Sequence, residues 1–325
     1  MKAIVCKEFA PWESLAYEEV PDPVVGKGQV LVDVKAAGIN FPDMLMVEGK
    51  YQVKPPTPFI PGAEVAGVVA EVGEGVSRFA VGDRVFGPVQ IGAFAERVAQ
   101  SEHAFFPMGE SMSFEQAAGL ALAYGTSYYA LKQRAQLQPG ETVLVLGAAG
   151  GVGIATVQLA KAMGAKVIAA ASSDEKLEFA AQAGADEGIN YSTEDLKQRT
   201  KELTGGKGAN VVYDPVGGDY SEQAFRATAW DGRFLVIGFA SGPIPKMPLN
   251  LALLKGSSLI GVFWGSWAAQ FPDENRKNLE EMVAMIDAGD FSPVVSETHD
   301  MENFADAFGA IAERRAKGKV VLTNS

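Results

Sequence analysis

A glycine-rich turn between two apolar segments constrains this chain most: T-V-L-V-L-G-A-A-G-G-V-G, at residues 142–153. Residues 142–146 are a short continuous apolar run, which is typical of a strand covered on both faces. From Val152 onward apolar residues recur at helical spacing, so the turn joins a buried strand to a helix. Backbone N–H groups and the helix dipole both point at such a turn, and together they make an anion site.

The turn carries most of the dinucleotide fingerprint G-x-G-x-x-G, with Ala148 in place of the first glycine. Gly150 permits close approach of a pyrophosphate, and Gly153 permits tight packing of the helix on the strand. Gly147 supplies the flexibility that Ala148 lacks. Glycines also mark plain turns, but this turn lies inside a run of strand-helix units. We therefore predict a dinucleotide site formed by Ala149, Gly150, Gly151, Val152 and Gly153.

Strand and helix patterns keep alternating after this turn, which indicates an α/β fold with a parallel, doubly wound Rossmann sheet. A capping box at Ser172 and Glu175 is expected to open the second helix. We assign residues 124–263 to this Rossmann domain. Further strands are predicted at 166–171, 187–190, 210–214, 233–237 and 258–262.

The sequence before and after residues 124–263 has a different pattern, with short alternating strands and many glycines and prolines. We expect residues 1–123 to be mainly antiparallel β-structure, completed by residues 264–325 through a strand at 319–322. In G-I-N-F-P-D, residues 38–43, a strand gives way to a loop and Pro42 fixes the turn. Asn40 is there either a binding group at a rim or a turn residue that bonds its own backbone.

Composition excludes several classes of partner. The chain has 325 residues, 47% of them hydrophobic, and a formal net charge of -12 without a basic cluster. A nucleic acid or an anionic membrane is therefore not an expected partner. Charges and a proline interrupt the first residues, where a secretory signal needs an apolar core. With Cys6 as the single cysteine, these features predict a cytoplasmic protein.

The end of the second predicted strand bears on the choice of dinucleotide. An NAD enzyme usually has an acid there for the ribose 2'-hydroxyl, whereas this chain has Ala171-Ser172-Ser173. Ser172, Lys176 and Tyr191 suit a 2'-phosphate, so we predict NADPH. In the alternative, Lys176 is an ordinary solvated lysine and Asp174 serves the ribose.

Several motifs in a fixed order now carry a resemblance: G-I-N-F-P-D, P-F-I-P-G-A-E-V-A-G-V-V, G-D-R-V-F-G, A-Y-G-T-S-Y-Y-A-L, A-A-G-G-V-G and G-K-V-V-L. Over essentially its whole length the chain resembles the zinc-free quinone oxidoreductase branch, which includes zeta-crystallin, of the medium-chain dehydrogenase/reductase superfamily. The resemblance implies a GroES-like catalytic domain, a Rossmann domain, a cleft between them, a preference for NADPH and a homodimer.

The residues that match the zinc ligands of that superfamily are not ligands here. In its zinc-dependent members a cysteine matches Asn40, and a histidine matches Ala63, just before Glu64. Zinc needs several Cys, His or carboxylate ligands, and this chain has one cysteine and two histidines, His103 and His299, far apart. We therefore predict no metal.

Without a Lewis acid, hydride transfer to an electron-poor acceptor such as a quinone or an enone remains accessible. The resemblance implies that Asn40 lies near the nicotinamide, where its amide can donate to the acceptor oxygen, and that Thr126 contacts the cofactor. Tyr51 either lines the substrate pocket and donates a proton or is an exposed loop tyrosine. Asp43 and Glu64 are expected to hold structure.

Further cofactor contacts are expected at the carboxyl ends of the last two strands, namely Gly238, Phe239, Phe263 and Gly265. In the alternative, the aromatic residues there only pack at the interface between the domains. The apolar sixth strand favours pairing across a twofold axis in a dimer. The predicted function is an NADPH-dependent quinone oxidoreductase acting on a small-molecule quinone or enone. The alternatives are an alkenal or enoyl double-bond reductase and a non-catalytic NADPH-binding protein.

Overall fold

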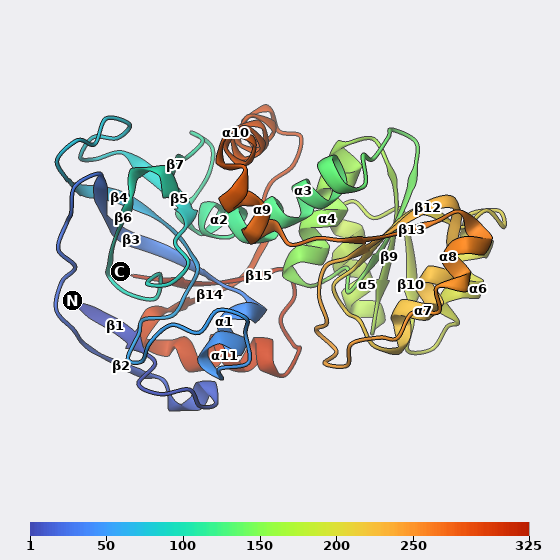
Figure 1. The fold of residues 1–325 in the computed structure, drawn as a ribbon, viewed down its shortest axis with the longest axis horizontal. Coiled ribbons are helices and arrows are strands. Elements are labelled where there is room, and N and C mark those ends of the chain that lie inside the picture. The colour runs from blue at the N-terminus through green and yellow to red at the C-terminus, as the bar shows by residue number, and fades with distance from the viewer. Residues whose placement is uncertain (325) are drawn as a thin grey trace. The chain divides into compact units, whose positions relative to one another are not determined.

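Six parallel strands form the sheet that the strand-helix alternation predicts, in the order β10-β9-β8-β11-β12-β13 (Figure 1). The structure is a computed structural model that describes residues 1–324. The chain divides into two units, Met1–Leu122 with Leu279–Ser325 and Ala123–Asn278. The strands of the second unit are β8 (Thr142–Leu146), β9 (Lys166–Ala171), β10 (Glu187–Asn190), β11 (Ala209–Asp214), β12 (Thr228–Val236) and β13 (Ser258–Gly261).

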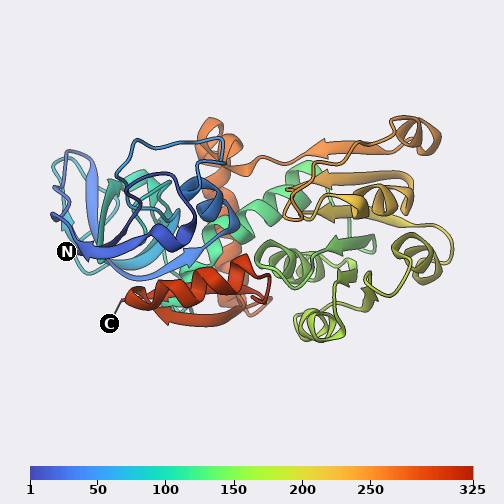
Figure 2. The same cartoon turned by 90° about the horizontal axis from the view of Figure 1, so that it is seen from below.

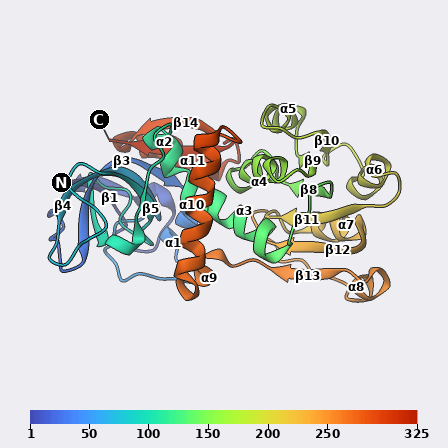
Figure 3. The same cartoon turned by 90° about the horizontal axis from the view of Figure 1, so that it is seen from above.

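Helices cover both faces of this sheet (Figure 3). Leu144, Val212 and Phe234 pack in one core cluster with Phe225 and Leu251. On the opposite face, the Tyr213 hydroxyl lies 3.0 Å from Ser127 Oγ, which also accepts a hydrogen bond from Thr156. The helices are α3 (Gly125–Tyr129), α4 (Gly151–Ala162), α5 (Asp174–Gln182), α6 (Leu196–Leu203), α7 (Asp219–Arg226), α8 (Asn250–Lys255) and α9 (Trp264–Gln270).

Strand β8 has no exposed face. Val143, Leu144, Val145 and Leu146 are fully buried, which explains why its sequence is a continuous apolar run and not an alternating one. The edge of the sheet differs, because within residues 1–324 β13 pairs with β12 alone and is only partly buried (Figure 2). The predicted doubly wound Rossmann fold is confirmed.

The first unit contains the predicted antiparallel β-structure. Its larger sheet has the order β14-β15-β3-β4-β5-β7, with β6 also on β3, and only β14 and β15 pair in parallel. Helix α11 packs against β14 and β15 (Figure 2). The strands are β1 (Lys2–Val5), β2 (Ala16–Glu19), β3 (Gln29–Ile39), β4 (Glu64–Val72), β5 (Arg84–Pro88), β6 (Arg97–Ser101), β7 (Phe106–Pro107), β14 (Val295–Asp300) and β15 (Lys319–Thr323).

The remaining helices are short apart from α10. Helix α10 (Pro272–Ala288) begins in the second unit and ends in the first. Along residues 1–324, every helix is too short or too polar to cross a membrane. The others are α1 (Phe41–Val47), α2 (Phe114–Ala118) and α11 (Phe304–Ala312). Short 3₁₀ helices lie at Trp12–Ser14, Glu102–Ala104 and Met301–Asn303, and π-helical turns lie at Leu120–Tyr124 and Ala130–Arg134.

The structure corrects three local expectations. Residues 264–278 lie in the second unit, because the Trp267 ring stacks on Tyr129 at 4.3 Å and Trp264 Nε1 donates to Asn275. Ser173, not Ser172, caps α5 by accepting from the backbone N–H of Lys176. Asn40 precedes a helix, not a loop, since α1 begins at Phe41 and tolerates Pro42 in its first turn.

Candidate functional site

The glycine-rich turn lies between β8 and α4, as the sequence predicts. A Cβ atom on Gly153 would lie 2.2 Å from the Gly147 carbonyl oxygen and 2.9 Å from Ala148 Cα, so the helix and the turn touch without room for a side chain. Gly147 has a positive φ of 57°. A Cβ atom on Gly150 would have only the Gly147 carbonyl oxygen within 4 Å, at 3.4 Å. The backbone before α4 is therefore open to a ligand.

The first turn of α4 leaves backbone N–H groups of Gly151, Val152 and Gly153 without helical acceptors. The helix has twelve residues, so its dipole adds to the attraction for an anion at this end. A network of hydroxyl groups beneath the turn holds it: Ser127 Oγ and Thr156 Oγ1 both donate to the Val152 carbonyl. This arrangement fits the pyrophosphate of a dinucleotide.

Thr126, Ser127 and Tyr213 belong to the same region of the second unit. Thr126 is half-buried in α3, directly before the Ser127 that bonds α4. Burial raises the pKa of Tyr213 to about 12, although Ser127 and Thr156 bond its hydroxyl. Tyr213 therefore stays protonated and structural at ordinary pH. The hydroxyl network was missed from the sequence, since its members come from three separate elements.

Three predicted residues gather at the carboxyl ends of β9 and β10. Lys176 Nζ donates to Ser172 Oγ at 3.4 Å, and the backbone N–H of Tyr191 bonds Ala171 at the end of β9. The Tyr191 ring lies 4.3 Å from the Tyr220 ring. Asp174, the alternative ribose ligand, accepts instead from Asn190 Nδ2 at 2.8 Å. A lysine and a hydroxyl thus meet where an NAD enzyme usually has an acid.

The last predicted cofactor residues follow β12 and β13. Gly238 donates its backbone N–H to the Asp214 carbonyl, and Phe239 packs over Gly217. Phe263 and Gly265 lie at the start of α9, past the carboxyl end of β13. These positions are at the ligand-binding edge of a parallel sheet.

The sequence predicted Asp214 only as the last residue of a strand and gave it no functional role. It is 3% exposed, and its Oδ1 accepts from the backbone N–H groups of Val216 and Gly217 while its Oδ2 accepts from Ser221. Burial raises its pKa, against these three hydrogen bonds. Asp214 thereby shapes the turn after β11 at the same edge of the sheet.

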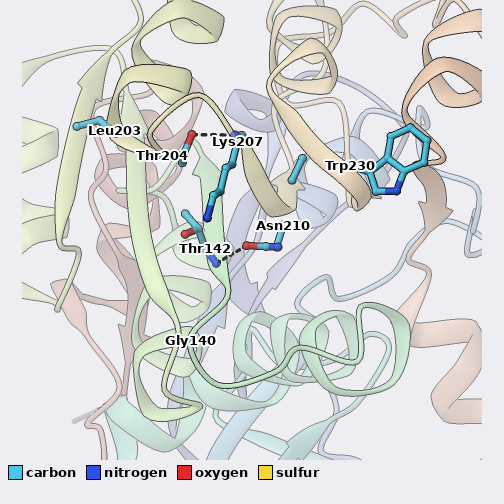
Figure 4. Close-up of a pocket in the computed structure, with 9 residues that line it drawn as sticks. Gly140, Thr142, Leu203, Thr204, Lys207, Asn210 and Trp230 are labelled. Atoms are coloured by element: carbon cyan, nitrogen blue, oxygen red, sulfur yellow. Dashed lines mark hydrogen bonds between the residues drawn. The ribbon is translucent and has the colours of Figure 1, made fainter.

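A surface hollow of about 630 Å³ lies elsewhere on the second unit (Figure 4). Thr142 and Asn210, at the amino ends of β8 and β11, form part of its wall, and the backbone N–H of Thr142 donates to Asn210. Parallel sheets bind ligands at the carboxyl ends of their strands. The hollow is therefore at the opposite edge from the glycine-rich turn and is not the candidate dinucleotide site.

The first unit contains a buried polar cluster around Asn40. Asn40 Nδ2 donates to Glu64 Oε1 at 2.9 Å, and its Oδ1 accepts from Lys319 Nζ at 2.6 Å. Lys319 also forms an ion pair with Glu64. The second carboxylate oxygen of Glu64 accepts from the backbone N–H of Leu122 at 2.8 Å. The Asn40 amide is thus not a turn residue bonding only its own backbone.

Asp43 and Tyr51 flank this cluster. The Asp43 carboxylate accepts the backbone N–H of Asn40 at 2.7 Å, which fixes the start of α1. Burial raises the Asp43 pKa to about 7, against the lowering effect of that bond and of the Lys319 charge. Burial, and next the charge of Asp43, raises the pKa of Tyr51. Tyr51 packs on the core of this unit, so it is not an exposed loop tyrosine.

Lys319 was missed as a functional candidate, although it is the second residue of the motif G-K-V-V-L. A lysine at the start of an otherwise buried apolar strand needs a buried partner, so the sequence alone could have indicated that Lys319 pairs with a buried acceptor. Among residues 1–324, no three His, Cys, Asp or Glu side chains gather as a metal site would require.

The chain matches two protein families in succession. Residues 26–124 match the alcohol dehydrogenase GroES-like domain, and residues 151–286 match the family described as zinc-binding dehydrogenase. Quinone oxidoreductase-like protein 2 of Rattus norvegicus is 42% identical over 323 residues, which cover 99% of this chain and 92% of the relative.

Solved structures of similar proteins agree with this match. A quinone oxidoreductase of Pseudomonas syringae pv. Tomato DC3000 is 36% identical with a TM-score of 0.91, over 99% of both chains. The Escherichia coli quinone oxidoreductase, solved in complex with NADPH, is 30% identical with a TM-score of 0.91 over 100% of both chains. The chain therefore belongs to the quinone oxidoreductase branch of the medium-chain dehydrogenase/reductase superfamily and is an oxidoreductase of that superfamily.

Proposed function

We propose that this protein is an NADPH-dependent reductase that delivers a hydride to a quinone or a related electron-poor carbonyl, without a metal. The observation that carries the proposal is the Asn40 carboxamide, held by a buried carboxylate and a buried ammonium group. Reduced nicotinamide, when bound, supplies the hydride. The acceptor gains that hydride and one proton and becomes a hydroquinone.

The chain's own groups can meet the charge that develops on the acceptor oxygen. One Asn40 N–H is engaged by Glu64, and the other makes only a long 3.4 Å contact with the Gly38 carbonyl. That second N–H can exchange this weak partner for an acceptor oxygen. The Tyr51 hydroxyl has a pKa above its ordinary value of 10, so it is protonated at neutral pH, and we propose it as a proton donor to the reduced acceptor.

The preference for NADPH rests on the second unit. Lys176 and Ser172 present an ammonium group and a hydroxyl where the ribose 2'-phosphate would bind. Asp174 Oδ1 accepts from Asn190 Nδ2, so the acid that could serve a 2'-hydroxyl already has a protein partner. NADPH in the related Escherichia coli structure supports the same choice.

The proposal of metal-free catalysis rests on the donor set. Asn40 and Lys319 surround Glu64 with groups that suit a carboxylate, and an ammonium group beside it repels a divalent cation. We expect activity to survive dialysis against a chelator, with metal analysis as the check. A loss of activity that zinc restores would contradict the proposal.

A dimer and a cytoplasmic location remain predictions. The edge strand β13 lies next in sequence to α8, whose Leu253 and Leu254 are 81% and 68% exposed, and Trp230 is 76% exposed. An apolar surface next to an unpaired strand edge favours association with a second copy.

One panel tests the activity. Purified protein is mixed with NADPH and in turn with benzoquinones, naphthoquinones, 2-alkenals and enoyl-CoA thioesters, while the nicotinamide absorbance is followed. We expect the quinones to give the highest kcat/KM. Faster turnover of alkenals or enoyl thioesters would indicate a double-bond reductase, and tight NADPH binding without turnover would indicate a binding protein.

A further inference from the structure

We propose that Lys319 is a positioning residue that sets the direction and the donor strength of the Asn40 carboxamide; this inference rests on the proposed function. Lys319 begins β15 and is 3% exposed, so its ammonium group is sealed inside the first unit. It contacts both other members of a closed ring, Asn40 and Glu64. Each member of this ring bonds the other two.

The chemistry of the ring allows a single orientation of the amide. Lysine only donates hydrogen bonds and an ionised carboxylate only accepts them. Asn40 Oδ1 must therefore face Lys319, and Nδ2 must face Glu64. A flipped amide would place an N–H₂ group against the ammonium and an oxygen against the carboxylate. The second N–H of Nδ2 is then always directed to the same place.

The lysine stem lies in a space that two glycines keep open. A Cβ on Gly38 would lie 2.5 Å from Glu64 Oε1 and 2.7 Å from Lys319 Cε. A Cβ on Gly119 would lie 2.9 Å from Lys319 Cγ. Gly38 lies inside strand β3, where a glycine usually marks a close approach of another group. The backbone is thus built around this side chain.

The ammonium group also polarises the amide. A cation at the carbonyl oxygen draws electron density away from the amide nitrogen, which makes the remaining N–H a stronger donor. Negative charge grows on the acceptor oxygen during hydride transfer, so a stronger donor favours the transition state over the ground state. Loss of Lys319 should therefore lower kcat and leave NADPH binding unchanged.

The test is a double-mutant cycle between Lys319→Met and Asn40→Ala, with the best quinone of the panel as acceptor. We expect Lys319→Met to lower kcat about tenfold to a hundredfold, less than the roughly 10²–10³-fold loss when an oxyanion donor itself is removed, because the Asn40 amide stays in place. In the Asn40→Ala background the same change should lower kcat no further, because its route of action is already gone. An equal loss in both backgrounds would overturn the inference.

Two further variants keep the result interpretable. Lys319→Met leaves Glu64 as an unpaired buried charge, so the Glu64→Gln/Lys319→Met pair removes both charges and carries the test if the single variant does not fold. Lys255→Met is the matched control, since Lys255 is half-buried and donates to two backbone carbonyls of the second unit. It should lower the melting temperature and keep kcat.

A readout without turnover separates this inference from the proposed function. The Asn40 side-chain amide signal in a ¹H–¹⁵N spectrum is identified by its absence from Asn40→Ala. In the wild type we expect two separate, downfield-shifted N–H resonances from a fixed, polarised amide. In the Lys319→Met variant they should move upfield and broaden. An unchanged signal refutes the role of Lys319 even if no acceptor is turned over, whereas a changed signal with no turnover refutes only the proposed function.

Discussion

Gly153→Ala and Gly150→Ala, both at the glycine-rich turn before α4, should have different effects: the first should lower stability and the second should weaken NADPH binding. A Cβ on Gly153 would lie 2.2 Å from the Gly147 carbonyl oxygen, about 1.2 Å short of ordinary contact at 3.4 Å. The atoms that this Cβ would overlap, Gly147 O and Ala148 Cα, both belong to the backbone, so no side chain can move aside to make room. The start of α4 must shift away from the end of β8.

The magnitude follows from this overlap. Overpacking a well-filled site costs about 1–3 kcal/mol, and a backbone obstacle places Gly153→Ala near the upper end, at about 2–3 kcal/mol. For a unit of this size that corresponds to a fall in melting temperature of roughly 4–12 °C. Differential scanning fluorimetry and circular dichroism measure this fall without any cofactor.

Gly150→Ala is the matched control. Its Cβ would meet only Gly147 O, at 3.4 Å, and its φ of -79° and ψ of 172° suit alanine. We expect its melting temperature to stay within about 1–2 °C of the wild type. The methyl group would stand where the pyrophosphate approaches, so the Kd for NADPH should rise about tenfold, or about 1.4 kcal/mol. Calorimetric titration measures the affinity.

A Gly153→Ala variant as stable as the wild type would contradict the predicted overlap with Gly147. A Gly150→Ala variant that loses as much stability as Gly153→Ala would contradict it equally, because the two positions would then not differ in space. Unchanged NADPH affinity in Gly150→Ala would show that the pyrophosphate does not approach this turn.

Three further predictions concern charge and assembly. The carboxyl of Asp43 has a pKa of about 7 in the folded chain and 3.8 as its ordinary value, so the native state holds a proton that the unfolded state releases. The free energy of unfolding should therefore fall between about pH 4 and pH 7, by at most about 4 kcal/mol, and urea unfolding of Asp43→Asn should show this slope removed. Lys176→Ala should raise the Kd for NADPH about tenfold while the Kd for NADH changes little, and equal losses would argue against a 2'-phosphate contact. Leu253→Asp places a charge on the exposed apolar surface of α8, so light scattering should give a monomer, and an unchanged mass would exclude this surface from the dimer contact.

Much of the candidate dinucleotide site could be predicted because it is local in sequence. The turn from Gly147 to Gly153 is continuous, and its glycines have the spacing that close packing of α4 on β8 requires. Ser172 and Lys176 lie four positions apart in one helix start, so their proximity also follows from the sequence. The one-residue error at the cap of α5 arose because Ser172 and Ser173 are both good caps, and only the backbone geometry distinguishes them.

The sequence by itself determined the fold class, since periodicity, glycines and strand length are properties of neighbouring residues. Tertiary structure alone decided the environment of Asn40. Its partners Glu64 and Lys319 begin two different strands, and Lys319 is 279 positions away in the chain. A lone lysine before V-V-L gives no sign of which carboxylate it meets, because an ion pair depends on distance in space and the pairing of β15 with β3 sets that distance. The spacing of residues along the chain specifies the fold, whereas the convergence of separate strands specifies the buried charges that hold the amide.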